Sequence, residues 1–142
     1  MRISDLLRRK GSLVVTVKPE QSVTDLLELL AEHKVGALVV SADGTTLDGI
    51  VSERDVVRRL HEFGPELLQS PVRDIMTAQV HVCPPDTELD ELMRVMTTGR
   101  FRHVPVMDAG RLVGIISIGD VVKHRIDELQ SERDQLTAYI QS

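Results

Sequence analysis

The sequence predicts an α+β fold: two tandem β-α-β-β-α repeats packed with pseudo-two-fold symmetry, followed by a long C-terminal helix. Three observations indicate this. Residues 49–55 recur 65 positions later, at residues 114–120. Strand-like and helix-like hydrophobic patterns follow in the same order before each copy. A heptad-like apolar stripe then runs through the last twenty or so residues.

The recurring stretch reads Gly-Ile-Val-Ser-Glu-Arg-Asp in the first copy and Gly-Ile-Ile-Ser-Ile-Gly-Asp in the second. Each reads as a buried strand that runs into a helix. Ser is a favoured N-cap, and Asp three residues later lies at the positive end of the helix dipole. Such a pattern is typical of a capping box in proteins that bind nothing. It also fits a nucleotide site, where a helix N-terminus attracts phosphate and a carboxylate accepts from ribose hydroxyls.

The similarity between the two copies extends over nearly the whole chain. Residues 35–40 correspond to residues 101–106, and the lead-in segment 3–7 resembles residues 72–76. A duplicated unit that cannot bury its own apolar face packs against its twin. We therefore expect a first repeat over residues 1–68, a second over 69–126, and an extended C-terminal helix over 118–142.

Within each repeat, the patterns predict a strand, a helix, a hairpin and a closing helix. The helices are recognised by apolar residues three and four positions apart and by capping residues at Ser22, Ser52, Thr87 and Ser117. The first strand reaches the second through a helix, so that pair should be parallel. The predicted strands cover residues 14–17, 36–40, 47–51, 80–82, 104–107 and 112–116.

The last helix should continue to about residue 140. Its apolar stripe is formed by Val122, Ile126, Leu129, Leu136 and Ile140, with Arg133 at the missing seam position. One interpretation is a helix that lies across its own chain. We favour a homodimer contact, because a long exposed apolar stripe needs a partner.

Composition excludes several classes of function. The formal net charge of −5 disfavours a nucleic-acid partner, and no apolar run is long enough to span a membrane. The N-terminus lacks the apolar core of a signal peptide. A single cysteine, Cys83, excludes an internal disulfide and fits a reducing compartment. We expect a cytoplasmic protein.

Taken together, the doubled unit, its two Gly-Ile-Val/Ile-Ser-x-x-Asp endings, the segment 102–106 (Arg-His-Val-Pro-Val) and the segment 72–77 between the repeats resemble a pair of CBS domains. These cystathionine-β-synthase-type repeats form what is called a Bateman module. The resemblance covers about residues 1–125, so the chain looks like a stand-alone pair. It implies a regulatory protein rather than an enzyme, one that senses cellular energy state and signals to a partner protein.

The resemblance also implies a ligand and its site. The family binds AMP, ADP, ATP, NAD or S-adenosylmethionine between the repeats as a regulatory ligand, with no required cofactor. Asp55 and Asp120 match the ribose-binding Asp, and Ser52 and Ser117 match the hydroxyl that faces ribose or phosphate. The other matching positions are Thr16 and His81 beside adenine, Ala37, Arg102 and His103 on the second strands, and Arg54 at a helix start.

The second repeat offers Arg102 and His103 where the first offers Gly36 and Ala37. Arg can grip phosphate with two hydrogen bonds. We therefore expect two non-equivalent clefts, one of them better suited to phosphate.

Two other functions remain open. A dimer that docks on a partner without any nucleotide would use the same fold. A zinc site could be formed by His81 and Cys83, on one face of a strand, with His103 nearby. No Ser-His-Asp or Cys-His pattern indicates an enzyme.

Overall fold

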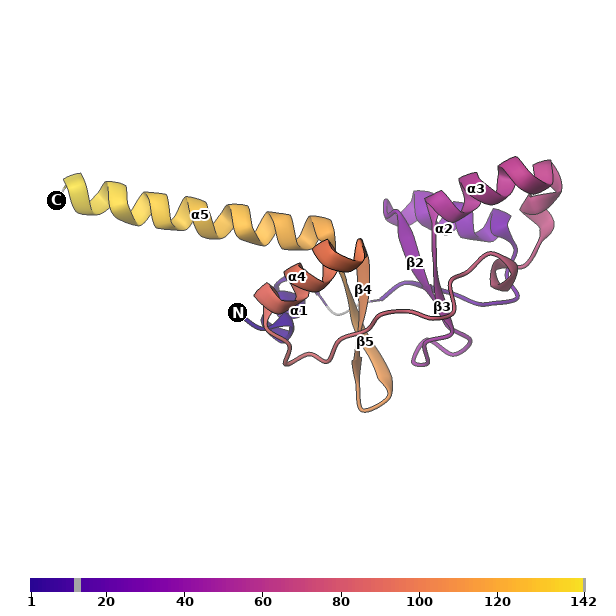
Figure 1. Cartoon of the computed structure of the whole chain (residues 1–142), viewed down its shortest axis with the longest axis horizontal. Coiled ribbons are helices and arrows are strands. Elements are labelled where there is room, and N and C mark those ends of the chain that lie inside the picture. Colours follow the sequence, from indigo (N-terminus) through magenta and orange to yellow (C-terminus); the bar gives the residue numbers. More distant parts are fainter. Residues whose placement is uncertain (12–13, 142) are drawn as a thin grey trace.

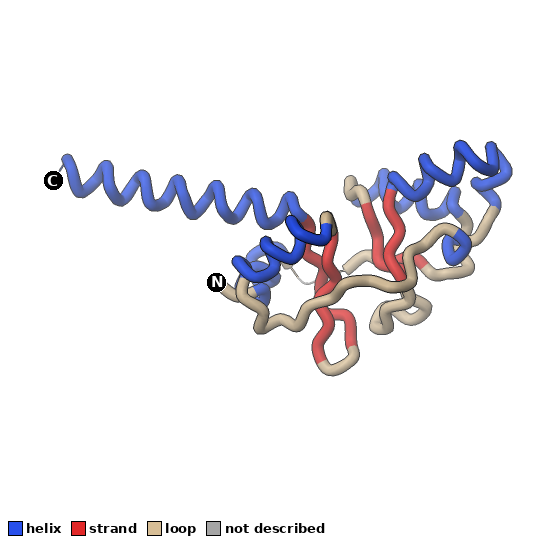
Figure 2. The backbone as a smooth tube through the Cα atoms, viewed as in Figure 1, coloured by secondary structure: helices blue, strands red, loops and turns tan. Residues whose placement is uncertain are grey.

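The computed structural model describes residues 1–11 and 14–141. The strands of the two repeats stand next to each other at the centre, and helices lie outside them on both flanks (Figure 2). The predicted α+β fold with two repeats and a long last helix is confirmed.

The first repeat contains β1 (Thr16–Val17), α2 (Val23–His33), β2 (Ala37–Val40), β3 (Gly49–Ser52) and α3 (Glu53–Phe63). The second contains α4 (Leu89–Gly99), β4 (His103–Asp108), β5 (Arg111–Ser117) and α5 (Ile118–Gln141). The remaining elements are the lead-in helix α1 (Ile3–Lys10) and the 3₁₀ turns η1 (Gly64–Gln69) and η2 (Val72–Asp74).

The two hairpins have matching registers. Ala37 pairs with Ser52 in the β2–β3 hairpin, and His103 pairs with Ser117 in the β4–β5 hairpin. The backbone N–H that follows each serine donates to the residue before the second strand, from Glu53 to Gly36 at 2.9 Å and from Ile118 to Arg102 at 2.8 Å. The duplication in the sequence is therefore a duplication of backbone geometry at the start of α3 and α5.

The first strands are shorter than predicted. β1 pairs with β2 in parallel, as expected, but covers only Thr16–Val17. The expected strand over residues 80–82 is wrong, because parallel pairing there is reduced to one bridge between Cys83 and Val106. Pro84 and Pro85 follow at once, and proline has no N–H with which to continue a ladder.

Each lead-in segment packs into the core of the opposite repeat. Ile3, Leu6 and Leu7 of α1 are buried in the second core, with α4, β4 and β5. Val72 and Ile75 are buried in the first core, with α2, β2 and β3. Each core therefore contains residues from both sides of the predicted division between residues 68 and 69. That division stays a prediction, which concerns where the sequence repeats.

Gly49 and Gly114 permit this exchange. A Cβ atom on Gly49 would lie 2.7 Å from the carbonyl oxygen of Thr77, and one on Gly114 would lie 2.5 Å from Cδ2 of Leu7. Both distances are too short for carbon, so the lead-in segments approach the hairpins only because these residues lack side chains. This explains why each recurring stretch begins with glycine.

Helix caps were largely predictable from the sequence. Ser22 and Ser52 form capping boxes with Asp25 and Asp55. Thr87 was expected to cap α4, but the N-cap is Glu88, which makes no side-chain cap hydrogen bond. The carbonyl of Thr87 instead accepts a backbone hydrogen bond of 2.9 Å from Ile3, because the lead-in helix passes beside it.

The last helix extends away from the body of the molecule, and its C-terminal half projects into solvent (Figure 1). Val121, near its start, is its buried residue. No helix in residues 1–11 and 14–141 combines the length and apolarity required to cross a membrane.

Candidate functional site

A cleft of about 750 Å³ lies between the two repeats. It is lined by the ends of both hairpins, by the starts of α3 and α5, and by the linker segment 77–81. Most of the side chains predicted for a nucleotide site line it together: Ala37, Ser52, Arg54, Asp55, His81, Arg102, His103 and Ser117. Thr16 and Asp120 do not line it. That these residues contact a ligand stays a prediction.

Asp55 is the carboxylate that the first repeat places in the cleft wall. Its Oδ2 accepts hydrogen bonds from the backbone N–H and the hydroxyl of Ser52, at 2.8 and 3.0 Å. No described residue donates a hydrogen bond to its other oxygen, Oδ1. The cap therefore fixes the carboxylate in place, while one oxygen remains open to a hydroxyl donor in the cleft.

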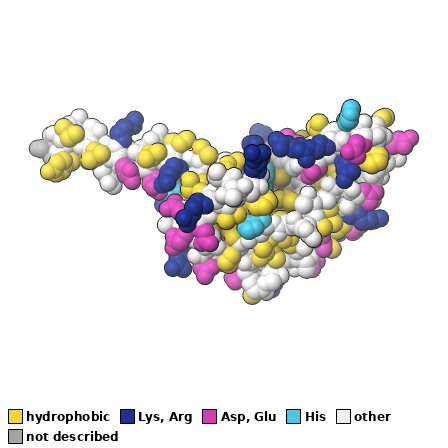
Figure 3. Space-filling model, viewed as in Figure 1, with side chains coloured by type: hydrophobic (Ala, Val, Ile, Leu, Met, Phe, Trp, Pro, Cys, Tyr) yellow, Lys and Arg dark blue, Asp and Glu magenta, His cyan; other side chains and the backbone are white. Residues whose placement is uncertain are grey.

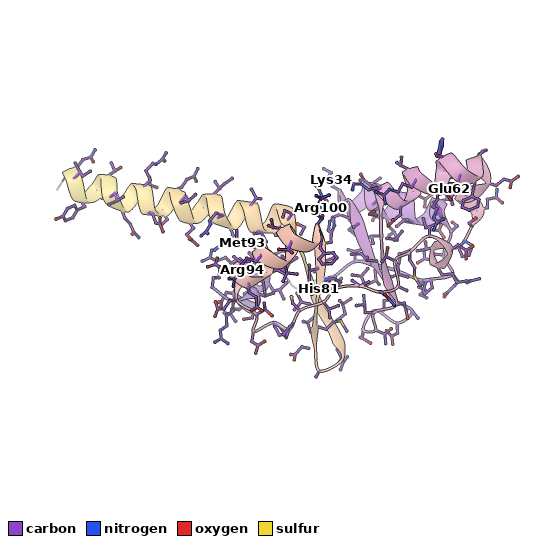
Figure 4. The ribbon with its side chains drawn as sticks, viewed as in Figure 1. Lys34, Glu62, His81, Met93, Arg94 and Arg100 are labelled. Carbon is purple, nitrogen blue, oxygen red and sulfur yellow. The ribbon has the colours of Figure 1, made fainter. Side chains whose placement is uncertain are left out.

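Three arginines, Arg54, Arg100 and Arg102, also line the cleft. None of them forms an ion pair or a side-chain hydrogen bond with another described residue, and all three are exposed. Lys and Arg side chains gather at the upper edge of the body between the two halves (Figure 3), where Lys34 and Arg100 are seen in Figure 4. Unpaired guanidinium groups in a cleft are suited to phosphate.

Arg100 is a cleft residue that the sequence analysis missed. It is the C-cap of α4 and has a left-handed backbone, with φ of 56°. Lys34 holds the equivalent place after α2, with φ of 54°. A cation just beyond each of two equivalent helices was the available signal, since cations are favoured at helix C-termini.

An aromatic pair lines the same cleft. His81, from the linker, and Phe101, from the entry to β4, stack with ring centroids 5.2 Å apart and planes 10° apart. Gly99 allows this arrangement, because a Cβ atom there would collide with the Phe101 ring. Phe101 was also missed as a site residue, since it reads in the sequence as a strand position.

His103 is partly buried at the junction of the repeats. Burial is the main influence that lowers its pKa, and the positive charges of Arg102 and Lys10 lower it further, while Asp120 acts in the opposite direction. A neutral imidazole can accept as well as donate a hydrogen bond. Whether His103 contacts a ligand stays a prediction.

Asp120 repeats the capping geometry of Asp55 but has an additional partner. Its Oδ2 accepts from the backbone N–H and hydroxyl of Ser117, at 2.8 and 2.9 Å. The ammonium of Lys10 also donates to Oδ2, at 2.6 Å. Burial raises the pKa of Asp120, but hydrogen bonds from Lys10 and Ser117 outweigh it, and the net effect is a lowered pKa.

The residues of the alternative zinc site, His81, Cys83 and His103, are not among any metal-binding group of the described residues. Cys83 is buried in the second core, and burial, followed by the charge of Glu91, raises the pKa of its thiol to about 11. Zinc binds the thiolate form, which this environment disfavours. Within the described residues, no group of three or more His, Cys, Asp or Glu side chains could hold a metal ion.

Comparison with known proteins gives one family. The family model described as "CBS domain" matches residues 3–62 and 72–127. The CBS domain-containing protein CBSX3, mitochondrial, of Arabidopsis thaliana is 35% identical, over 98% of this chain and 71% of that protein. YhcV of Bacillus subtilis, also described as CBS domain-containing, is 30% identical over 80% of this chain and 79% of its own.

Solved structures agree. The CBS-domain containing protein ATU1752 from Agrobacterium tumefaciens is 50% identical and superimposes with a TM-score of 0.83, covering 88% of this chain and 99% of that one. CBSX2, solved in complex with AMP, is 35% identical with a TM-score of 0.73, covering 89% and 96% of the two chains.

Proposed function

Because this chain belongs to the CBS domain family, we propose that it is a regulatory module that binds an adenosine-containing nucleotide between its repeats. The observation that carries this proposal is the Asp55 carboxylate, fixed by its own helix cap with one oxygen open to the cleft. A ribose diol donates two hydrogen bonds, and a fixed carboxylate is a suitable acceptor for them.

The rest of the cleft supplies what the other parts of a nucleotide need. Arg54, Arg100 and Arg102 offer unpaired positive charge to phosphate. The stacked rings of His81 and Phe101 offer an apolar, flat surface to a purine. A relative that is 35% identical was crystallised with AMP, which supports this class of ligand. AMP, ADP, ATP, NAD and S-adenosylmethionine all carry the adenosine group.

The test is a calorimetric and thermal-shift screen of these five ligands on the unsubstituted chain and on Asp55→Asn. At a hundredfold excess over the dissociation constant, a ligand should stabilise the fold by about 2.7 kcal/mol. Asp55→Asn should weaken binding by at least about tenfold, since hydrogen bonds to a charged acceptor contribute roughly 1.5–3 kcal/mol.

Asp25→Asn is the matched control. Asp25 forms the same capping box with Ser22 at the start of α2, but it does not line the cleft. Both substitutions should lower stability by about 1 kcal/mol through the cap. Only Asp55→Asn should lower affinity. Equal affinity in the two variants, or no ligand in the screen, would reject the proposal and favour a protein that docks without nucleotide.

We also infer that α5 joins two copies of the chain. The residues of its apolar stripe are about half exposed or more: Val122 50%, Ile126 49%, Leu129 56%, Leu136 64% and Ile140 80%. These residues have heptad spacing along a helix of 24 residues, about 36 Å long. A second copy with the same stripe would bury it and could pass a change in the cleft to a partner protein.

The oligomeric state tests this inference. Leu129→Glu with Leu136→Glu should convert a dimer to a monomer in analytical ultracentrifugation, since two carboxylates would be desolvated in the seam. Ser131→Glu with Ala138→Glu adds the same charge at the heptad positions opposite the stripe and should leave the dimer intact. A monomeric unsubstituted chain would exclude this role for α5.

A further inference from the structure

We propose that Lys10 is a tethered competitor that occupies the ribose-binding carboxylate of the second repeat, so that a nucleotide binds first at Asp55. This inference rests on the proposed function and names the residue that makes the two repeats unequal. The sequence predicts an inequality that comes from Arg102 and His103. Both of those residues line the cleft that contains Asp55.

The two carboxylates form an internal comparison. Each Oδ2 accepts from the backbone N–H and the hydroxyl of its own serine, at 2.8 and 3.0 Å for Asp55 and at 2.8 and 2.9 Å for Asp120. Each backbone N–H returns a bond to that serine, at 3.3 and 3.1 Å. The caps are therefore equivalent, and the carboxylates differ in that Asp120 also accepts from Lys10.

Lys10 is held by two acceptors. Its ammonium donates to Oδ2 of Asp120 and to the backbone carbonyl of Ile115, both at 2.6 Å. The side chains of Lys10 and Asp120 are only 31% and 23% exposed, so solvent screens this pair less than it screens a surface pair. His103 also lies within electrostatic reach of Lys10 and Asp120, and its pKa is lowered chiefly by burial and further by Arg102 and Lys10.

The exchange of lead-in segments explains why a lysine reaches this place. In the first repeat, Ile50 exchanges two backbone hydrogen bonds of 2.9 Å with Thr77, which follows the short η2 turn. In the second repeat, α1 continues as a helix to Lys10. The carbonyl of Ile115, equivalent to that of Ile50, therefore receives the lysine ammonium in place of a backbone N–H.

Occupation by Lys10 conflicts with ribose binding. A carboxylate offers about four lone-pair positions, two on each oxygen. Three donors already converge on Oδ2 of Asp120, whereas two converge on Oδ2 of Asp55. No described residue donates to Oδ1 of either carboxylate, so the difference is one of charge: the ammonium of Lys10, 2.6 Å from Oδ2, already compensates the charge of Asp120, and a diol that binds there must compete with it.

The test uses AMP and the Asp55→Asn background, in which the Asp55 site is weakened by at least about tenfold. Binding at Asp120 then makes up a larger share of the measured signal. Adding Lys10→Met keeps the length and the apolar stem of the side chain. It should tighten this residual binding by roughly fivefold, because a fivefold change in affinity corresponds to the free energy of a partly exposed ion pair. A further Asp120→Asn substitution should abolish the gain.

Arg9→Met in the same background is the control for charge. Arg9 is exposed and forms no ion pair with a described residue, so this change should leave residual binding unaltered. Unchanged or weaker AMP binding with Lys10→Met would overturn this inference while leaving the Asp55 site in place. Absence of AMP binding to the unsubstituted chain would overturn it as well, and only an entirely negative ligand screen would also reject the proposed function.

Discussion

His81 and Phe101 stack across the cleft wall, with 5.2 Å between ring centroids and 10° between ring planes. One ring comes from the linker between the repeats and the other from the residue that leads into β4. The pair thus fixes the linker against the second repeat at the place where a purine would lie in the proposed function.

Phe101→Ala should therefore weaken nucleotide binding by about tenfold, since stacking of one base on an aromatic side chain contributes about 1–3 kcal/mol. Isothermal titration of the tightest ligand in the screen measures this. Phe63→Ala is a suitable control, because Phe63 is exposed at the end of α3 and does not line the cleft. Equal loss in both variants would indicate a general effect on the fold.

Acid should reduce the stability of the fold through His103. Its folded pKa lies below the ordinary value of 6.5, because burial and two nearby cations oppose protonation. Below pH 6.5 the unfolded chain therefore binds a proton that the folded chain binds only at lower pH, and stability is lost as the pH falls. Urea titrations at pH 7.5 and 5.5 should show this loss, and His103→Gln should make it smaller. If the free energy of unfolding falls by the same amount between pH 7.5 and 5.5 in both proteins, the assignment to His103 is contradicted.

Cys83 should resist alkylation in the folded protein. Its thiol is 5% exposed and has a pKa raised to about 11, so little thiolate is present at pH 8. Mass spectrometry after treatment with iodoacetamide should find it unmodified in buffer and fully modified in urea. Rapid labelling of the folded protein would show that the second core opens readily.

Gly114→Ala should destabilise the protein by about 1–3 kcal/mol, because the new Cβ atom would meet Leu7 in a packed core. Gly36→Ala is the matched control, since its Cβ would have no neighbour closer than 3.9 Å. Thermal unfolding of both variants measures the difference. Similar midpoints would mean that α1 does not pack against the hairpin in solution.

Local features of this fold were readable in the sequence. The Ser-x-x-Asp caps at Ser52 and Ser117 and the hairpins that precede them depend on neighbouring residues, so their patterns were sufficient. Thr87 looked like a cap by the same reasoning, but the N-cap is Glu88, and the Thr87 carbonyl accepts a backbone hydrogen bond from the distant Ile3. Contacts between segments far apart are not encoded in local patterns.

The candidate site shows the same limit. Asp55, Arg102 and His81 were identified through the family resemblance, and the structure brings them to one cleft. Lys10 and Asp120 are 110 positions apart, and their contact depends on how far α1 continues and on which repeat it joins. The sequence likeness of residues 3–7 to residues 72–76 revealed that both are lead-in segments, but not that each belongs to the opposite core.

The exchange of lead-in segments also sets the order in which the chain can fold during synthesis. The core of the first repeat lies between Val17 and Ile75, so all its members are available once that stretch has left the ribosome. Ile3, Leu6 and Leu7 emerge earlier but have no core to join until Val121 has been made. For most of translation, the apolar face of α1 has no binding site, and its docking is the step that completes the second repeat.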